Sequence, residues 1–278
     1  QIPLMHEQHE KDILVTGLPR SGTTLLVALL NAQANTVALA EPFSVGQFST
    51  DPEHFVQDIK TSLQSARTSI SETGYGITVA LPSGEIATNF FDTSSSEDGL
   101  RKRLVKRHKI EFTQPLSSDF TLYVKHPAIF TAQWQELARH FKIFASIRSP
   151  LAVLASWQTL KLPVSRGRLP MGERHNIDLK NRLDAESNIL DQQIIILQWF
   201  LSRYRQFPPQ NIIRYEDIIN DHQQALQTIH PGAEKTDLDI GVTPLAERYP
   251  TIDLGELKAA LQPIRPLIDT FDPEGMPE

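Results

Sequence analysis

The chain has 278 residues, of which 40% are hydrophobic and 22% charged, and its formal net charge is −6. This composition is typical of a globular protein with an ample core, and the acidic balance argues against nucleic acid as a partner. The absence of cysteine excludes disulfides, thiolate catalysis and cysteine–zinc sites. No run approaches the roughly 18 to 20 apolar residues of a membrane span. We therefore expect a cytoplasmic protein without a membrane span.

The sequence near the N-terminus predicts a strand, a glycine loop and a helix. Residues 13–16 form a β-branched apolar run that is typical of a buried strand. Gly17 and Gly22 then bound a tight loop, and leucines recur with helical spacing over 25–30. In this arrangement unpaired backbone N–H groups and the helix dipole converge on one point. The loop can therefore hold a phosphate.

The loop departs from a nucleotide-triphosphate P-loop at one position. Its glycine spacing is close to that motif, but Thr23 stands where the motif has a lysine, and Arg20 is the loop's cation. Such a loop can cradle a 5′-phosphate and present positive charge to a group attached to it. It is poorly equipped for Mg-nucleotide triphosphate chemistry. A P-loop nucleotide kinase or phosphotransferase is one alternative, and a non-catalytic nucleotide-binding module is another.

The loop resembles the 5′-phosphosulfate loop of sulfotransferases that use 3′-phosphoadenosine-5′-phosphosulfate (PAPS). Arginine at position 20 makes it more similar to tyrosylprotein, carbohydrate and bacterial members than to cytosolic phenol and steroid members, which mostly carry lysine there. The resemblance implies cofactor-binding roles for Pro19, Arg20, Ser21, Gly22, Thr23 and Thr24.

A second motif has the order and spacing that the family uses for the 3′-phosphate. An apolar strand over 141–147 delivers Arg148 at its carboxyl end, and Ser156 follows eight residues on in a helix that Pro150 starts. A guanidinium and a hydroxyl can both donate hydrogen bonds to a phosphate. The alternative is that Arg148 and Ser156 have only structural roles, as an arginine at the edge of the core and a serine within a helix. Further on, the string Arg-Tyr-Glu-Asp-Ile resembles a family element near the adenine, so Tyr215 is the implied contact.

Two charged residues follow predicted strands directly, where open α/β sheets bind ligands. Glu41 follows the strand over 36–40, and Lys125 ends the strand over 120–124. By position alone, Glu41 could equally be a solvated loop residue. The resemblance to protein-tyrosine sulfotransferases implies that Glu41 is the general base and that Lys125, with Arg20, stabilises charge on the transferring group. His126 is the alternative base.

We expect an α/β fold of the P-loop NTPase type, with a mainly parallel central sheet flanked by helices. A single sulfotransferase domain would span 1–278, with 12–43 and 120–230 as the nucleotide-binding core and 44–119 as an irregular insertion shaping the acceptor pocket.

Several local elements are also predicted. In the insertion we expect a helix over 51–67 and a hairpin that pairs 77–81 with 85–91. Beyond the core we expect a mobile loop over 160–176 and one long helix over 182–204.

Basic residues provide the only sequence hint about the acceptor. Residues 101–103 and 106–109 form a basic run, and Arg166 and Arg168 lie in the predicted loop. A solvated face is one interpretation of the run, and a wall for an acidic or sugar-like acceptor is the other. The resemblance implies transfer from PAPS, without a metal and with 3′-phosphoadenosine-5′-phosphate (PAP) as product. The acceptor would be a hydroxyl of a glycan, lipid, natural product or peptide. The late Arg-Lys-Gly segment of cytosolic members is absent from the sequence.

Overall fold

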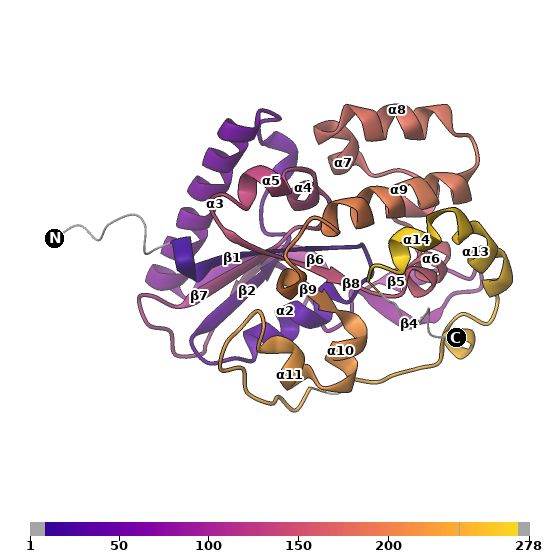
Figure 1. Ribbon diagram of the computed structural model, residues 1–278. Coiled ribbons are helices and arrows are strands. Elements are labelled where there is room, and N and C mark those ends of the chain that lie inside the picture. The colour runs from indigo at the N-terminus through magenta and orange to yellow at the C-terminus, as the bar shows by residue number, and fades with distance from the viewer. Residues whose placement is uncertain (1–8, 239, 272–278) are drawn as a thin grey trace.

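The computed structural model describes residues 9–238 and 240–271, and its centre is a five-stranded sheet. The strand order is β2-β7-β1-β8-β9, and every neighbouring pair is parallel. The α/β fold predicted from the sequence is thereby confirmed (Figure 1). The strands of the sheet are β1 (Asp12–Gly17), β2 (Thr36–Ala40), β7 (Thr121–Lys125), β8 (Lys142–Ile147) and β9 (Ile212–Arg214).

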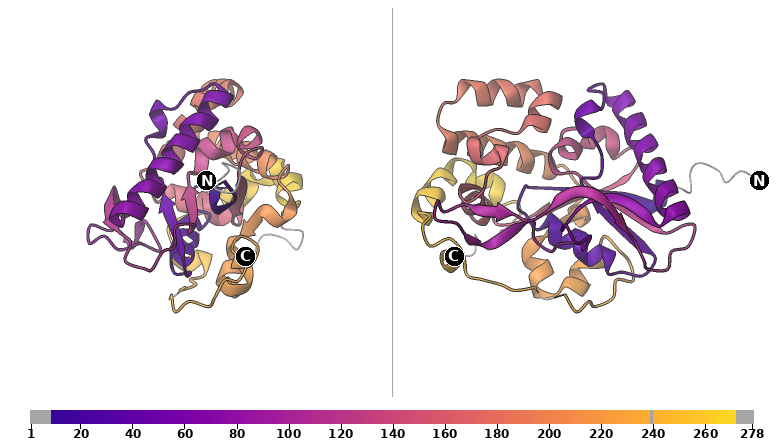
Figure 2. Two further views of the ribbon diagram at one scale, coloured as in Figure 1. Left: turned by 90° about the vertical axis from the view of Figure 1, so that its left-hand side faces the viewer. Right: turned by 180° about the vertical axis from the view of Figure 1, so that it is seen from behind.

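The sheet is covered by helices on both faces (Figures 1 and 2), which is why its strands are continuous apolar runs. Alternate residues of β1 serve the two faces, with Leu14 in one core cluster and Val15 in the other. The first cluster is shared with α3 (Pro52–Thr73), α4 (Pro127–Ala132), α6 (Pro150–Gln158) and α9 (Ile189–Tyr204). The second is shared with α2 (Thr23–Asn31), α10 (Tyr215–Asn220) and α11 (His222–Leu226).

Shorter helices complete the fold around these layers. They are α5 (Trp134–Leu137), α7 (Pro170–His175), α8 (Ile177–Ala185), α12 (Leu245–Arg248), α13 (Leu254–Ala260) and α14 (Arg265–Ile268). Within the described ranges 9–238 and 240–271, none of the helices has the length and apolar character that crossing a membrane requires.

The segment between β2 and β7 is more regular than the sequence suggested. Its helix α3 begins where the Asp51 carboxylate accepts the His54 N–H and ends at Thr73, six residues beyond the predicted end, with Gly74 as its C-cap. Two small antiparallel sheets follow, made by β3 (Tyr75–Ala80) with β6 (Lys106–Glu111) and by β4 (Phe91–Ser95) with β5 (Arg101–Arg103).

The predicted hairpin is wrong, although its turn exists. The Gly84 N–H donates to the Leu81 carbonyl at 2.9 Å, but the chain beyond the turn does not pair with β3. Residues 75–80 pair instead with 106–111 in a six-residue register. A turn signal is local, whereas the partner strand lies far along the chain and offers more backbone hydrogen bonds.

Two further expectations about local structure are corrected. The predicted loop over 160–176 contains a 3₁₀ helix at Pro163–Arg166 and the helix α7. The predicted long helix is divided into α8 and α9 by a break before Asn188. The Asn188 side chain accepts the Asp191 N–H at 3.1 Å, so it caps a new helix.

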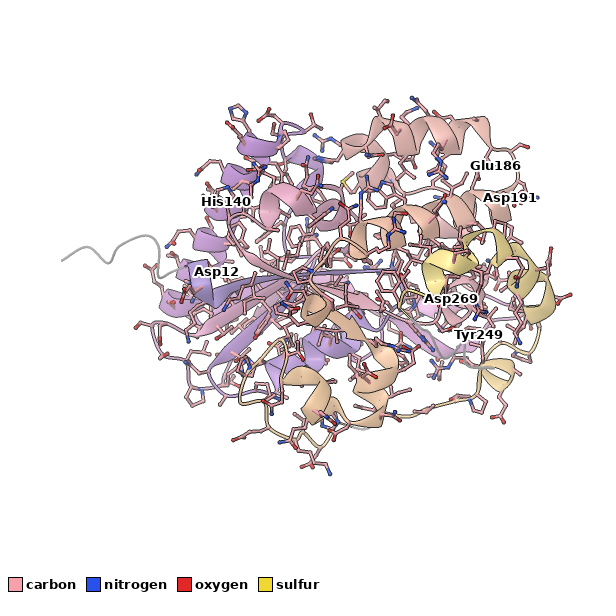
Figure 3. All side chains as sticks on the ribbon, in the orientation of Figure 1. Asp12, His140, Glu186, Asp191, Tyr249 and Asp269 are labelled. Atoms are coloured by element: carbon pink, nitrogen blue, oxygen red, sulfur yellow. The ribbon has the colours of Figure 1, made fainter. Side chains whose placement is uncertain are left out.

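A buried ion pair fastens α3 to the sheet. Arg67 contacts the Asp12 carboxylate, and its Nη1 donates to the Phe120 carbonyl at 2.7 Å. Both charged side chains are buried, with relative exposures of 4% for Arg67 and 5% for Asp12. Asp12 is the first residue of β1 (Figure 3), so it lies at the opposite end of that strand from the glycine loop. The pair therefore stabilises the end opposite to the site described below.

We expect Arg67→Met to lower the free energy of unfolding by about 3–5 kcal/mol, because it removes the buried guanidinium that contacts the Asp12 carboxylate and the Phe120 carbonyl. Urea denaturation followed by circular dichroism measures the change. The matched control is Arg139→Met, which removes an exposed pair with Glu136 and should cost at most about 1 kcal/mol. Equal losses in the two variants would contradict a structural role for the Arg67–Asp12 pair.

Candidate active site

The strand order brings the predicted site residues to one edge of the sheet. Along the carboxyl edge lie Glu41 after β2, Lys125 at the end of β7, the glycine loop after β1, Arg148 after β8 and Tyr215 after β9. At a spacing of about 4.8 Å between neighbouring strands, this row spans roughly 19 Å. Residues far apart in the sequence thus form one line, with the loop at its centre.

One cavity of about 620 Å³ follows this line, within the usual size of small-molecule sites. Ten of the predicted site residues line it: Pro19, Arg20, Gly22, Thr23, Thr24, Glu41, Lys125, His126, Arg148 and Tyr215. Ser21 and Ser156, the other two, are buried behind it.

The loop is shaped so that its backbone faces the cavity. Gly22 has a φ of 87°, and a Cβ there would lie 2.3 Å from the Tyr215 ring, so both conformation and space require glycine. The first bond of the α2 ladder is donated by the Leu26 N–H to the Gly22 carbonyl, at 3.0 Å. The N–H groups of residues 22–25 precede this ladder and can meet an anion.

Two side chains hold the loop from behind. The Ser21 hydroxyl donates to the Ser146 carbonyl of β8 at 2.8 Å, and the Ser146 hydroxyl donates back to the Ser21 carbonyl at 2.9 Å. The Trp157 indole of α6 donates to the Pro19 carbonyl at 2.9 Å. Ser21 therefore fixes the loop through its side chain and its carbonyl, and it does not line the cavity.

Ser156 is a shared acceptor for two arginines. Arg20, at a φ of 77°, donates from Nε to the Ser156 Oγ at 3.2 Å and from Nη2 to the Asn89 Oδ1 at 3.0 Å. Arg101 donates from Nη2 to the same Ser156 Oγ at 2.9 Å. The structure thus pairs Ser156 with Arg20 rather than with Arg148. Sequence reasoning missed Asn89, and it placed Arg101 in a basic run interpreted either as a solvated face or as a wall for an acidic acceptor, whereas the structure buries Arg101 beside the loop.

The arginines around the loop repel one another. Burial lowers the pKa of Arg20 to about 10, and the neighbouring Arg101, Arg148 and Arg248 contribute in the same direction. Among the residues that the structure describes, none of these four guanidinium groups forms an ion pair with a carboxylate. Arg248 comes from α12, in a C-terminal region where the sequence offered no motif. The centre of the cavity is therefore strongly attractive to anions.

Tyr215 lies between the loop and Arg148. Its ring packs against Gly22, and the Arg148 guanidinium carbon is 4.3 Å from the ring centroid. The next residue, Glu216, accepts the Ser149 N–H at 2.9 Å, which fastens α10 to the beginning of α6. These contacts fix the direction in which Arg148 points into the cavity.

Glu41 and Lys125 form an ion pair at the other end of the row. Nζ and Oε1 are 2.7 Å apart, and the side chains are 3% exposed for Lys125 and 36% for Glu41. Burial is the largest influence and opposes ionisation of the carboxyl group, but the Lys125 ammonium, with smaller contributions from His126 and Arg103, holds the pKa of Glu41 below its ordinary value. Glu41 therefore presents an ionised carboxylate to the cavity at neutral pH.

His126 is held in a neutral, engaged state. Burial lowers the pKa of His126 to about 3. Its Nε2 accepts the Phe43 N–H at 3.3 Å, and the two rings stack with centroids 5.6 Å apart. Because the ring nitrogen that can accept a proton already has a donor, Glu41 is better placed than His126 to act as a base.

The chain is thus an α/β protein whose candidate site is one cavity. A glycine loop, flanking arginines and a carboxylate–lysine pair surround that cavity. The model of the sulfotransferase family matches residues 12–233. The chain belongs to this family, which makes it a transferase of sulfuryl groups.

Other comparisons add little to this assignment. No curated protein matches the chain. One similar solved structure is the sulfotransferase STF9 from Mycobacterium avium, at 14% identity and a TM-score of 0.38. The match covers 95% of this chain and 77% of the other. At that TM-score, the likeness carries no weight for the site.

Replacing Lys125 by methionine should raise the pKa of Glu41 above the ordinary value of a glutamate. Burial would then act on the carboxyl group without the ammonium that now outweighs it. A pH titration of the carboxyl carbon by NMR measures the shift, and Glu41→Gln identifies the resonance. An unchanged titration in Lys125→Met would show that the ion pair does not form in solution.

Proposed function

We propose that this enzyme transfers a sulfuryl group from PAPS to an acceptor hydroxyl, with Glu41 as the general base. The main support for this proposal is that arginines without carboxylate partners and an ionised carboxylate line the same cavity. A donor with phosphates at both ends needs several separated cations, and the acceptor needs a base beside them. The row along the sheet edge supplies both.

The residues present fit such a donor. The loop N–H groups, Arg20, Thr23 and Thr24 would hold its 5′ end. Arg148 and Arg248 would bind the 3′-phosphate, because a guanidinium offers paired donors to phosphate oxygens. Tyr215 would contact the adenine. Ser156 would act by orienting Arg20, to which it is hydrogen-bonded. When bound, the donor supplies a sulfuryl group on a phosphate leaving group.

In the transfer step, the acceptor hydroxyl loses its proton to the Glu41 carboxylate while its oxygen forms a bond to sulfur. The bond from sulfur to the 5′-phosphate oxygen breaks, and PAP leaves with the electron pair. Arg20 and Lys125 stabilise the charge that develops on that oxygen. Protonation of Glu41 removes the negative partner of Lys125 at the moment when the leaving oxygen becomes negative. The ion pair thereby couples proton transfer to stabilisation of the leaving group.

The division of the chain follows from this assignment. Residues 12–43 and 120–230 would form the nucleotide-binding core of a single sulfotransferase domain, and 44–119 would contribute to the acceptor side. A kinase reading is disfavoured because Thr23 occupies the position of the P-loop lysine. A non-catalytic nucleotide-binding module would have no use for the Glu41–Lys125 pair.

Calorimetric titration with PAP, with AMP, which lacks the 3′-phosphate, and with ATP–Mg tests the donor site. Wild type should prefer PAP, and Arg148→Met should weaken PAP binding by about 10- to 100-fold, the value of a charge-assisted hydrogen bond, while AMP binding stays constant. Arg166→Met, an exposed position outside the cavity, is the control. A preference for ATP–Mg, or indifference to the 3′-phosphate, would favour the kinase.

Turnover measurements separate the two candidate bases. Glu41→Gln should reduce kcat by about 10²- to 10⁴-fold, the usual contribution of a general base, while its PAP affinity stays unchanged. His126→Gln should lose far less, because the glutamine oxygen can still accept the Phe43 N–H. The opposite ranking would identify His126 as the base. Full activity in both variants would contradict the proposed general-base mechanism.

A further inference from the structure

The cavity continues past the Glu41–Lys125 pair into an apolar region. Six side chains line it, here called the acceptor wall: Val45, Ile129, Leu162, Val164, Leu169 and Met171. We propose, resting on the function above, that the acceptor is an uncharged and largely apolar molecule with one reacting hydroxyl. An acidic glycan or peptide would not suit this wall.

The acceptor wall lies at the end of the cavity where the base is. Val45 follows Glu41 by four residues, and Ile129 is in α4, which begins two residues after Lys125. The helix α7, which carries Met171, packs against α4. Arg20 lies in the loop at the centre of the row, and Arg148 follows β8, on the other side of the loop from Lys125. An acceptor with its hydroxyl near Glu41 would therefore rest its remaining atoms on the wall.

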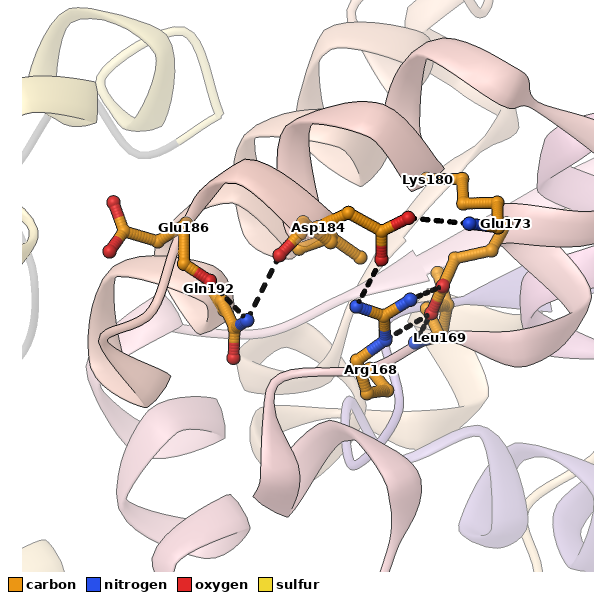
Figure 4. A network of polar contacts seen from close by, with 8 residues as sticks. Arg168, Leu169, Glu173, Lys180, Asp184, Glu186 and Gln192 are labelled. Carbon is orange, nitrogen blue, oxygen red and sulfur yellow. Dashed lines mark hydrogen bonds and ion pairs between the residues drawn. The ribbon is translucent and has the colours of Figure 1, made fainter.

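Several of the basic side chains that suggested an acidic acceptor form ion pairs or hydrogen bonds within the protein. Arg168 pairs with Glu173 and, at 2.8 Å, with Asp184 (Figure 4). Arg107 donates to the Phe43 carbonyl at 2.9 Å. Arg101 is buried against Ser156. Their charges support the structure and are not directed at the acceptor.

Of the other basic residues in 101–109 and of Arg166, all within the described part of the chain, Arg103 alone lines the cavity. Arg166 is exposed and lies outside the cavity. Arg103 does line the cavity, but it is exposed and its Nε donates to the Val105 carbonyl at 3.2 Å. A charged acceptor body could meet Arg103 only near solvent. Against the wall itself, the charge would lose its hydration without a partner, which is strongly unfavourable.

The wall is built in advance by the polar network behind it. The Glu173 carboxylate accepts the Leu169 N–H at 2.7 Å while it pairs with Arg168 (Figure 4). On α9, Gln193 donates to the Val164 carbonyl at 3.0 Å. These bonds fix the backbone on which Leu169 and Val164 stand. A preformed apolar surface binds an apolar ligand without first paying to order its loops.

Two matched probes test the proposal: 2-naphthol, and 6-hydroxy-2-naphthoic acid, which adds a carboxylate to the same ring system. Their binding to the PAP-loaded protein is measured by naphthol fluorescence, so the readout does not depend on turnover. We expect 2-naphthol to bind at least about tenfold more tightly than the acid, the scale on which an apolar pocket discriminates. Tighter binding of the acid, lost in Arg103→Gln, would overturn the proposal.

A second test of the acceptor proposal introduces a carboxylate into the acceptor wall. Met171→Glu should weaken 2-naphthol binding about tenfold or more and leave PAP affinity unchanged, which also shows that the variant is folded. Ile77→Glu is the matched control, because it adds the same carboxylate at an exposed apolar residue outside the cavity. Equal loss of 2-naphthol binding in both variants, or no loss in Met171→Glu, would contradict the wall.

The failure of the chemistry is distinguishable from the failure of the acceptor class. Absence of PAP binding in wild type would overturn the proposed function before any acceptor is added. If PAP and 2-naphthol bind together and no sulfate ester of naphthol forms from PAPS, the transfer mechanism fails and the apolar acceptor site stands. Formation of the ester by wild type, and its loss in Met171→Glu, supports both.

Discussion

The position of β1 between β7 and β8 determines where the charged groups of the site lie. Parallel strands have all their carboxyl ends at one edge, so whatever follows each strand is brought to that edge. Because β1 is central, its glycine loop lies between Lys125 of β7 and Arg148 after β8. The division of the cavity into an arginine-rich half and a carboxylate-bearing half is a consequence of that strand order.

The two halves handle charge in opposite ways. At one end, Lys125 and Glu41 neutralise each other at 2.7 Å, so neither charge needs a ligand to compensate it. Around the loop, Arg20 and Arg101 share a single serine oxygen and receive no carboxylate among the described residues. Such a cluster opposes folding and becomes favourable when an anion enters it. A ligand that binds only the folded state would therefore stabilise the protein.

Arginine has several different functions in this chain. Arg67 fastens α3 to β1, and Arg168 holds the segment that carries part of the acceptor wall. Arg148 lines the cavity with its guanidinium over the Tyr215 ring. The number of basic residues in a stretch is consequently a poor guide to its ligand. The partner of each guanidinium decides whether its charge supports the fold or remains for a substrate.

The sequence by itself determined the fold class and the residues at the strand ends. The glycine loop, Glu41, Lys125 and Arg148 are recognisable because each depends on a local pattern of strand, turn and helix. Gly22 was predicted from loop geometry, and the structure adds the Tyr215 ring as a second reason. These features involve neighbours in the chain, so a single sequence contains the information.

Only the tertiary structure decided which distant residues meet. Arg101 and Ser156 are 55 positions apart, and nothing near either residue indicates the other. The partner of β3, the entry of Arg248 into the cavity and the pairing of Arg168 with Asp184 were equally hidden. Each depends on packing between separate elements, where many partners are compatible with the same local sequence. The apolar character of the acceptor wall follows from such packing, because its side chains come from segments far apart in the chain.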